Sequence, residues 1–312
     1  MKLAIRTAKF TPARRAMLKR VEGVIEEYEA MGYSLTLRQL YYQLVAKDLI
    51  PNTLRDYKNL GNLLNTARWA GEVSWTALED RTRNVVRRPA WEEPSDLLSA
   101  CARQYHERHI YEQPTYIEAW VEKDALIGVV ERSVYPYDVP CLACRGYLSA
   151  SEAFSAVERF QAAKAAGCKR IVVLHLGDHD PSGIDMTRDL EDRLNELANH
   201  ETWGWGPALE VEVDRIALNM DQIRRYDPPP NPAKLTDSRA GAYVDEHGYS
   251  SWELDALRPD VIDALIREEL ERRLDASIRE RALRRIQARR DGLADLAMTH
   301  GRDLSLLTGD EE

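Results

Sequence analysis

The chain has 312 residues, 44% of them hydrophobic, so it can bury a sizeable core and is long enough to form two domains. It opens without the apolar segment of a signal peptide and has no apolar run near the roughly 18 residues of a membrane span. We therefore expect a cytoplasmic protein without a membrane partner. The net charge of −9 is uneven, because residues 1–90 contain 16 Lys and Arg against 9 Asp and Glu, whereas the rest contains 27 against 43. A basic segment on an acidic chain indicates a module that binds a polyanion.

Three short helices are predicted near the N-terminus. Thr11, Thr36 and Thr53 are suitable N-cap residues, and Gly71 ends the third helix. The apolar segment EVSW that follows is a candidate β-wing. Three helices and a wing are typical of a winged-helix DNA-binding domain, which we place at residues 1–84.

The second of these helices contains two adjacent tyrosines. At about 100° per residue, Tyr41 belongs to the apolar stripe of the helix, whereas Tyr42 lies about 130° from its centre, on the same side as Arg38. Tyr42 is therefore expected to face solvent. A half-exposed ring beside a solvated arginine is one interpretation, and a nucleophile beside a guanidinium that grips phosphate is the other.

Residues 85–114 contain several prolines and mixed charge and are predicted to link two domains. Cys101, His106 and His109 in this segment form an incomplete metal site, because a fourth ligand is not apparent. The four cysteines of the chain are too few and too scattered for a disulfide framework, so we expect reduced thiols.

Beyond this linker, strand-like apolar runs at 115–121, 139–144 and 170–176 alternate with helical stretches. This alternation predicts an α/β domain at 115–257, with a doubly wound parallel sheet covered on both faces. The second run contains the C-x-x-C motif CLAC. It lies in an apolar strand and no second pair follows, so a zinc or redox role is not favoured.

Three carboxylates follow two of the predicted strands. Glu122 ends the first run, and Asp178 and Asp180 come directly after the third. Ligands of a parallel sheet gather at the carboxyl ends of its strands, and hard carboxylate oxygens suit Mg²⁺. The alternative is that DHDPSG is only a capped turn between a strand and a helix, for which its residue types are also suitable.

The final segment, 258–312, is charged and predicted to be a helical extension. Its apolar positions form one stripe, which indicates a packing or dimerising helix. These positions are Ile262, Leu265, Ile266, Leu270, Leu274 and Ile278.

Several of these motifs resemble one known family. TLRQLYY resembles the R-x-x-Y-Y motif of the A subunit of DNA topoisomerase VI and of its relative, the meiotic double-strand-break transesterase. VEKDAL and GDHDPSG resemble the Toprim domain that follows the winged helix in those proteins, and RGYLSASEAF and SWELDAL resemble further segments of it. The likeness extends over about residues 10–270 and is greatest to the stand-alone forms of bacteria and phages. Ser182 departs from the family pattern, which has an aromatic residue there.

The resemblance implies a type IIB topoisomerase-like reaction on double-stranded DNA. Tyr42 would be the nucleophile that forms a 5′-phosphotyrosyl bond, and Arg38 would hold the scissile phosphate. Glu122, Asp178 and Asp180 would bind Mg²⁺, with Glu122 also acting as general acid. Basic residues expected to contact DNA are Arg14, Arg15, Arg55, Lys58, Arg68, Lys123 and Arg145.

The resemblance also implies a homodimer, in which the tyrosine of one copy meets the metal of the other, and a place with the nucleoid. The sequence has no P-loop, so a topoisomerase of this kind would need a separate ATP-binding subunit. Two other functions stay open. One is a hydrolytic Toprim nuclease that does not use the tyrosine, and the other is a DNA-binding protein that does not cleave.

Overall fold

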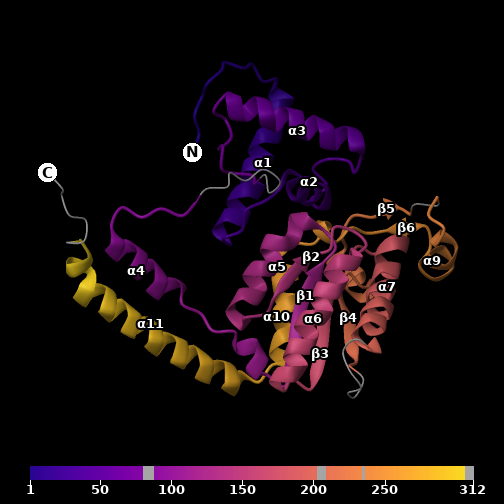
Figure 1. Ribbon diagram of the computed structural model, residues 1–312. Coiled ribbons are helices and arrows are strands. Elements are labelled where there is room, and N and C mark those ends of the chain that lie inside the picture. The colour runs from indigo at the N-terminus through magenta and orange to yellow at the C-terminus, as the bar shows by residue number, and fades with distance from the viewer. Residues whose placement is uncertain (80–87, 202–208, 234–235, 306–312) are drawn as a thin grey trace.

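The computed structural model of the chain describes residues 1–79, 88–201, 209–233 and 236–305. It is an α/β protein in which a group of N-terminal helices lies against one end of a parallel sheet and its covering helices (Figure 1). A second, elongated pair of helices extends from the opposite end of the sheet.

The three predicted N-terminal helices are confirmed. They are α1 (Pro12–Ala30), α2 (Leu37–Ala46) and α3 (Leu54–Trp69). The side chains of Thr11, Thr36 and Thr53 each accept a hydrogen bond from a backbone N–H in the first turn that follows, so all three predicted N-caps are present. The helices enclose a core of their own around Val21, Tyr28 and neighbouring apolar side chains.

The EVSW segment is not a strand, so the predicted β-wing is wrong at these residues. Residues 71–77 form turns and bends, and backbone pairing nearby consists of single bridges, between Ala4 and Ala70 and between Leu35 and Leu78. Residues 80–87, which complete the predicted domain, lie outside the described residues.

A parallel sheet forms the centre of the second part, as predicted, and it has a fourth strand beyond the three predicted runs. Its strands are β1 (Thr115–Val121), β2 (Cys141–Ala143), β3 (Arg170–Leu176) and β4 (Val211–Ala217), in the order β2-β1-β3-β4. The connecting helices are α5 (Ile127–Val134), α6 (Ala150–Ala166) and α7 (Pro181–Ala198). Every residue of β1 is buried, because helices cover both faces of the sheet.

The strand order creates a topological switch point. The chain moves from β1 to β2 on one side and then returns to β3 on the other, so right-handed crossovers place α5 and α6 on opposite faces. The loops after β1 and β3 therefore diverge and leave a crevice at the carboxyl end of the sheet. Val121 pairs with Leu176 in register, which places the residues after these two strands next to each other.

Shorter elements flank the sheet at its two ends. They are η1 (His109–Glu112), η2 (Asp124–Leu126), η3 (Tyr135–Tyr137), α8 (Met220–Tyr226), α9 (Ala240–His247), η5 (Leu254–Ala256) and an antiparallel pair, β5 (Asn231–Pro232) and β6 (Ser250–Ser251). A backbone bridge between His179 and Trp252 ties the loop after β3 to the segment that leads into η5.

The predicted linker and the predicted final helix both differ from the structure. The linker contains α4 (Pro94–Gln104), and the C-terminal stripe is divided between α10 (Pro259–Arg273) and α11 (Ala276–Ser305). Asp275 causes the break, because its carboxylate accepts hydrogen bonds from the backbone N–H groups of Ser277 and Ile278 and caps a new helix. α10 packs beside α5, whereas α11 runs along α4 (Figure 1). No helix of the described residues is both long and apolar enough to cross a membrane.

Candidate functional site

Tyr42 lies beside Arg38 on α2, as predicted, but it does not face solvent. The exposed fraction of Tyr42 is 6%, close to the 4% of Tyr41, so the prediction of a solvent-facing phenol is wrong. The guanidinium of Arg38 lies 5.7 Å from the centre of the Tyr42 ring. Burial raises the pKa of Tyr42 well above its ordinary value, and the negative charges of Glu253 and Asp255 add to this increase.

The cover over Tyr42 comes from a distant part of the sequence. The segment at η5 packs against the face of α2 that the helical pattern assigned to solvent, and the side-chain amide of Gln43 donates to the carbonyl of Ala256 at 3.4 Å. A helical wheel predicts the face that turns away from a helix's own core, but it contains no information about a second element that covers this face.

Arg38 is held by two carboxylates of the SWELDAL segment. Its guanidinium forms an ion pair with Glu253, and its Nε lies 2.8 Å from Oδ2 of Asp255. The side chain of Asp255 is completely buried, whereas that of Arg38 is 45% exposed, so solvent reaches one side of this ion pair. In the free chain the proposed phosphate-binding group is therefore already bound to anions.

Lys123 is largely enclosed, with 16% of its side chain exposed, and its ammonium group is paired with acids rather than free for the predicted DNA contact. Its Nζ lies 2.8 Å from Asp178, 2.7 Å from Glu253 and 3.1 Å from Asp255. Burial alone would lower the pKa of Lys123, but these three acids reverse the shift and raise it. Because Glu253 contacts both Arg38 and Lys123, a continuous ionic network joins α2 to the carboxyl end of the sheet.

Acidification is expected to weaken this network through Glu253. Burial alone would raise the pKa of Glu253, but Lys123 and Arg38 lower it to about 2. A carboxyl with a lowered pKa stabilises the folded chain above the unfolded value of about 4.3, and this stabilisation is lost as the pH falls towards 2. We expect this stabilisation to be about 2 kcal/mol, less than the full pKa shift would give, because solvent partly screens the carboxylate of Glu253. Thermal unfolding should therefore show that the stability advantage of wild type over Glu253→Gln shrinks between about pH 6 and pH 3; an unchanged advantage would contradict it.

The three predicted acids lie at the same end of the sheet but serve different local contacts. Oε2 of Glu122 accepts the backbone N–H of Asp178 at 2.9 Å, and Oδ1 of Asp178 accepts the N–H of Leu254 at 2.8 Å. Burial raises the pKa values of Glu122 and Asp178. Oδ1 of Asp180 accepts the N–H of Gly183 at 2.7 Å and caps α7. Asp180 therefore acts as a helix N-cap, as in the alternative interpretation of DHDPSG as a capped turn.

The acid trio does not fit a single Mg²⁺ in this conformation. Carboxylate oxygens have the right chemistry, but one oxygen of Asp178 is paired with Lys123 and the other with a backbone N–H. Among the described residues, the ligand atoms that come within 4.8 Å of one another belong to His106, His109 and Asp138, and not to this trio. Mg²⁺ binding at the trio would require Asp178 to leave Lys123.

Arg215, on β4, was not identified from the sequence. Its buried guanidinium donates to the carbonyls of Gly177, Asp178 and Gly183, and so holds the turn that carries the two aspartates. Burial lowers its pKa to about 10, although Glu122 and the aspartates oppose the shift. Nothing in the sequence around β4 distinguishes this arginine from an exposed one in a strand.

Gly183 permits the close approach of this turn to α7. A Cβ at Gly183 would lie 2.2 Å from the carbonyl oxygen of Asp178, a backbone atom that cannot move aside without breaking the turn. Gly183→Ala should therefore lower the free energy of unfolding by several kcal/mol, roughly the 3 kcal/mol typical of severe core strain, as measured by chemical denaturation. Gly241→Ala is the matched control, because a Cβ there in α9 meets nothing within 4 Å. Equal stability of the two variants would contradict the assignment.

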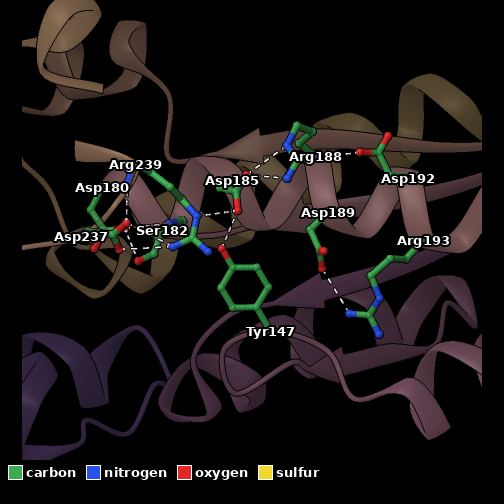
Figure 2. Close-up of polar contacts among 11 residues, drawn as sticks. Tyr147, Asp180, Ser182, Asp185, Arg188, Asp189, Asp192, Arg193, Asp237 and Arg239 are labelled. Carbon is green, nitrogen blue, oxygen red and sulfur yellow. Dashed lines mark hydrogen bonds and ion pairs between the residues drawn. The ribbon is translucent and has the colours of Figure 1, made fainter. Parts of the chain in front are cut away.

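The acids along α7 are balanced by arginines (Figure 2). Asp185 accepts from the hydroxyl of Tyr147 at 2.7 Å and pairs with Arg239 at 2.8 Å and with Arg188 at 2.7 Å. Tyr147 belongs to the RGYLSASEAF segment, so this contact fixes that segment one turn along α7 from the Asp180 cap. The exposed face of this helix is therefore an ion-pair network rather than a bare acidic surface.

A cavity of about 300 Å³ opens beside Tyr42 and Arg38. Its walls include Tyr57 of α3, Asn231 of β5 and Glu253, so both parts of the chain contribute. This volume is at the lower end of the range for small-molecule sites and is large enough for part of a nucleotide. A second cavity of about 430 Å³ adjoins the other side of Arg38.

Most of the predicted DNA-contacting residues are on the surface. Arg14, Arg15, Arg55, Lys58 and Arg145 are exposed, and Arg145 pairs with Asp124 at 3.0 Å. Arg68 is half-buried and donates to the carbonyl of Leu78 at 3.2 Å, so it faces inward.

The CLAC cysteines are free thiols in and after β2. Burial raises the pKa of Cys141 to about 11 and that of Cys144 to about 12. Burial therefore disfavours the thiolate form of both cysteines in this structure.

The ionic network is the feature that unites the candidate residues. It connects Arg38 on α2 with Glu253, Lys123 and Asp178, which come from three other segments of the chain. Comparison with family models, curated proteins and solved structures finds no match. The chemistry of these side chains is therefore the basis for a functional proposal.

Proposed function

We propose that the chain cleaves DNA with Tyr42 as its nucleophile, in the manner of the A subunit of topoisomerase VI. On this proposal, α1 to α3 act as a winged-helix-like DNA-binding module and the parallel sheet acts as a Toprim domain. The observation that carries it is the network that links Arg38, beside Tyr42, to the acids at the switch point of the sheet. The motifs named from the sequence lie far apart along the chain and meet at this network.

The side chains have roles that suit this reaction. A backbone phosphate would replace Glu253 at the guanidinium of Arg38, since both are anions and Arg binds phosphate in a bidentate manner. The phenol of Tyr42 would then pass its proton to the displaced carboxylate of Glu253, with which it interacts in this structure, and its oxygen would bond to phosphorus as the bond to the 3′ oxygen breaks. Glu122, whose pKa is raised by burial, would supply the proton that the leaving oxygen takes up. The product is a 5′-phosphotyrosyl bond and a free 3′ hydroxyl.

Two copies of Tyr42 are needed to cut both strands, so we propose a homodimer on double-stranded DNA. Strand passage would further require a separate ATP-binding subunit, and such a protein would act at the nucleoid. The resemblance also implies a requirement for Mg²⁺, which we include in the proposal. Mg²⁺ would bind here only if Asp178 released Lys123 and bound the cation instead.

A hydrolytic nuclease is the second candidate, and one observation favours it. Tyr42 is buried with a raised pKa in the free chain, so it is not poised to attack until Glu253 has moved. In a hydrolytic reaction water would attack phosphorus, and the tyrosine would only pack against Arg38.

Supercoiled plasmid distinguishes these functions. The full chain is incubated with plasmid and Mg²⁺, the reaction is stopped with detergent, and the DNA ends are analysed. Protein attached to 5′ ends supports the tyrosine mechanism, and broken DNA with free 5′ phosphates supports hydrolysis. DNA that stays intact but migrates as a protein complex would show binding without cleavage and would refute both enzymatic proposals.

A further inference from the structure

A second polar cluster lies away from the ionic network, where α4 joins the α/β part of the chain. His106 lies between α4 and η1, His109 is the first residue of η1, and Asp138 follows η3. One ligand atom from each of the three lies within 4.8 Å of the others. The sequence contained the two histidines, but the third member is about 30 residues away and joins them only in the folded chain.

The histidines differ in their surroundings. Nε2 of His106 lies 2.7 Å from Oδ1 of Asp138, which satisfies one half of the cluster without a metal. His109 has an exposed fraction of 1%, and its buried Nδ1 has no hydrogen-bond partner among the described residues. A buried ring nitrogen without a partner is uncommon in folded proteins, and an ion at this site would provide one. Glu112 and Arg279, which carry opposite charges, also act on His109.

The position of Asp138 is fixed from outside the cluster. Its backbone has φ of 56°, in the left-handed region that Asp tolerates better than most residues. Oδ2 accepts the backbone N–H of Ile110 at 3.0 Å, which leaves Oδ1 directed at His106. A hydrogen bond of this kind from the protein backbone orients a carboxylate for metal binding.

We propose that His106, His109 and Asp138 form a site for a borderline transition-metal ion, of which Zn²⁺ is the best fit. Two imidazoles and one carboxylate suit Zn²⁺, whereas Mg²⁺ and Ca²⁺ prefer oxygen ligands throughout. Three protein ligands leave one tetrahedral position for water. Zinc ligands at about 2.0–2.2 Å from the ion lie roughly 3.4 Å apart, so the contact between His106 and Asp138 needs to open by less than about 1 Å.

The bound ion joins the segment after α4 to the segment after η3. It therefore fastens α4, and α11 that packs along it, to the α/β part of the chain. Cys101 is exposed and is not a member of the cluster, so the thiol that the sequence placed beside the histidines has no part in it. The site does not depend on the proposed DNA cleavage.

Titration of the metal-free full chain with ZnCl₂ alone, followed by calorimetry, tests the site. Wild type is expected to bind one Zn²⁺ and to show a higher Tm with Zn²⁺ than without it. Asp138→Asn keeps an oxygen for the N–H of Ile110 but loses the charge, and it should bind Zn²⁺ at least 10-fold more weakly. His106→Gln should behave in the same way, since its half-exposed ring can be removed without opening the core.

Two control variants separate this cluster from other ligands. His200→Ala removes an exposed histidine that is not a member of the cluster, and Cys101→Ser removes the exposed thiol five residues before His106. Both should bind Zn²⁺ as wild type does. The proposal is overturned if wild type takes up no Zn²⁺, if Asp138→Asn and His106→Gln retain full affinity, or if Cys101→Ser loses it. Circular dichroism and the Tm without Zn²⁺ identify any variant that has failed to fold.

Discussion

Replacing Tyr42 with phenylalanine is expected to abolish the covalent protein–DNA adduct while DNA binding persists. The substitution removes only the phenol oxygen, which is the atom that would bond to phosphorus. Adducts are measured by detergent-stopped cleavage of plasmid followed by detection of protein on the 5′ ends, and binding by mobility shift without Mg²⁺. The expected loss is at least 1,000-fold, because no neighbouring group can replace the nucleophile.

Tyr41→Phe provides the matched control one residue away. The hydroxyl of Tyr41 lies 3.0 Å from the carbonyl of Thr53 and 3.1 Å from Asn52, so it serves packing and the entrance to α3. Its loss should cost about 1 kcal/mol of stability and leave adduct formation nearly unchanged. If the two variants lose adducts equally, Tyr42 has no special role. If Tyr42→Phe still breaks DNA and leaves free 5′ phosphates, the hydrolytic candidate is correct.

Lys123→Met is expected to cause the largest loss of stability of any single change at the site. The substitution keeps the length of the side chain but leaves Asp178, Glu253 and Asp255 together without their shared cation. Removing one partner of a buried ion pair typically costs 3–5 kcal/mol, because the remaining charge has lost both water and its counterion. Denaturant unfolding at neutral pH should show a loss of about this size.

Lys169→Met is the control, since that lysine is exposed just before β3 and its loss should change stability by less than about 0.5 kcal/mol. The Lys123→Met loss should also shrink when Glu253→Gln is added, because one of the stranded charges is then removed. Additive effects of the two substitutions would mean that Lys123 and Glu253 are not coupled, contrary to the 2.7 Å contact.

The elements with local signals were predictable from the sequence. Thr11, Thr36 and Thr53 were correct N-caps because capping depends on the residue type and on the turn that follows it. The parallel sheet was predictable because strands buried on both faces are continuously apolar. The same reasoning placed Glu122 and Asp178 next to each other, since the ends of adjacent parallel strands meet at one edge.

The features that depend on distant segments were not predictable. Burial of Tyr42 comes from η5, more than 200 residues later, and a charged residue such as Lys123 carries no sign that three acids will enclose it. α4 was missed because prolines and charges near it suggested an irregular linker, although the helix is stabilised by contact with α11. The cluster of His106, His109 and Asp138 likewise required the fold to bring its third member into place.

The carboxylates around Arg38 also affect which anions can compete for it. Chloride or a single free phosphate would gain little by replacing Glu253 and Asp255 at the guanidinium of Arg38. Small cellular anions should therefore leave this ion pair intact. A long polyanion releases its condensed counterions when it docks on many basic side chains at once, and this can displace both acids. If the chain acts on DNA as proposed, the internal ion pair would set a threshold that a nucleic acid passes and a small metabolite does not.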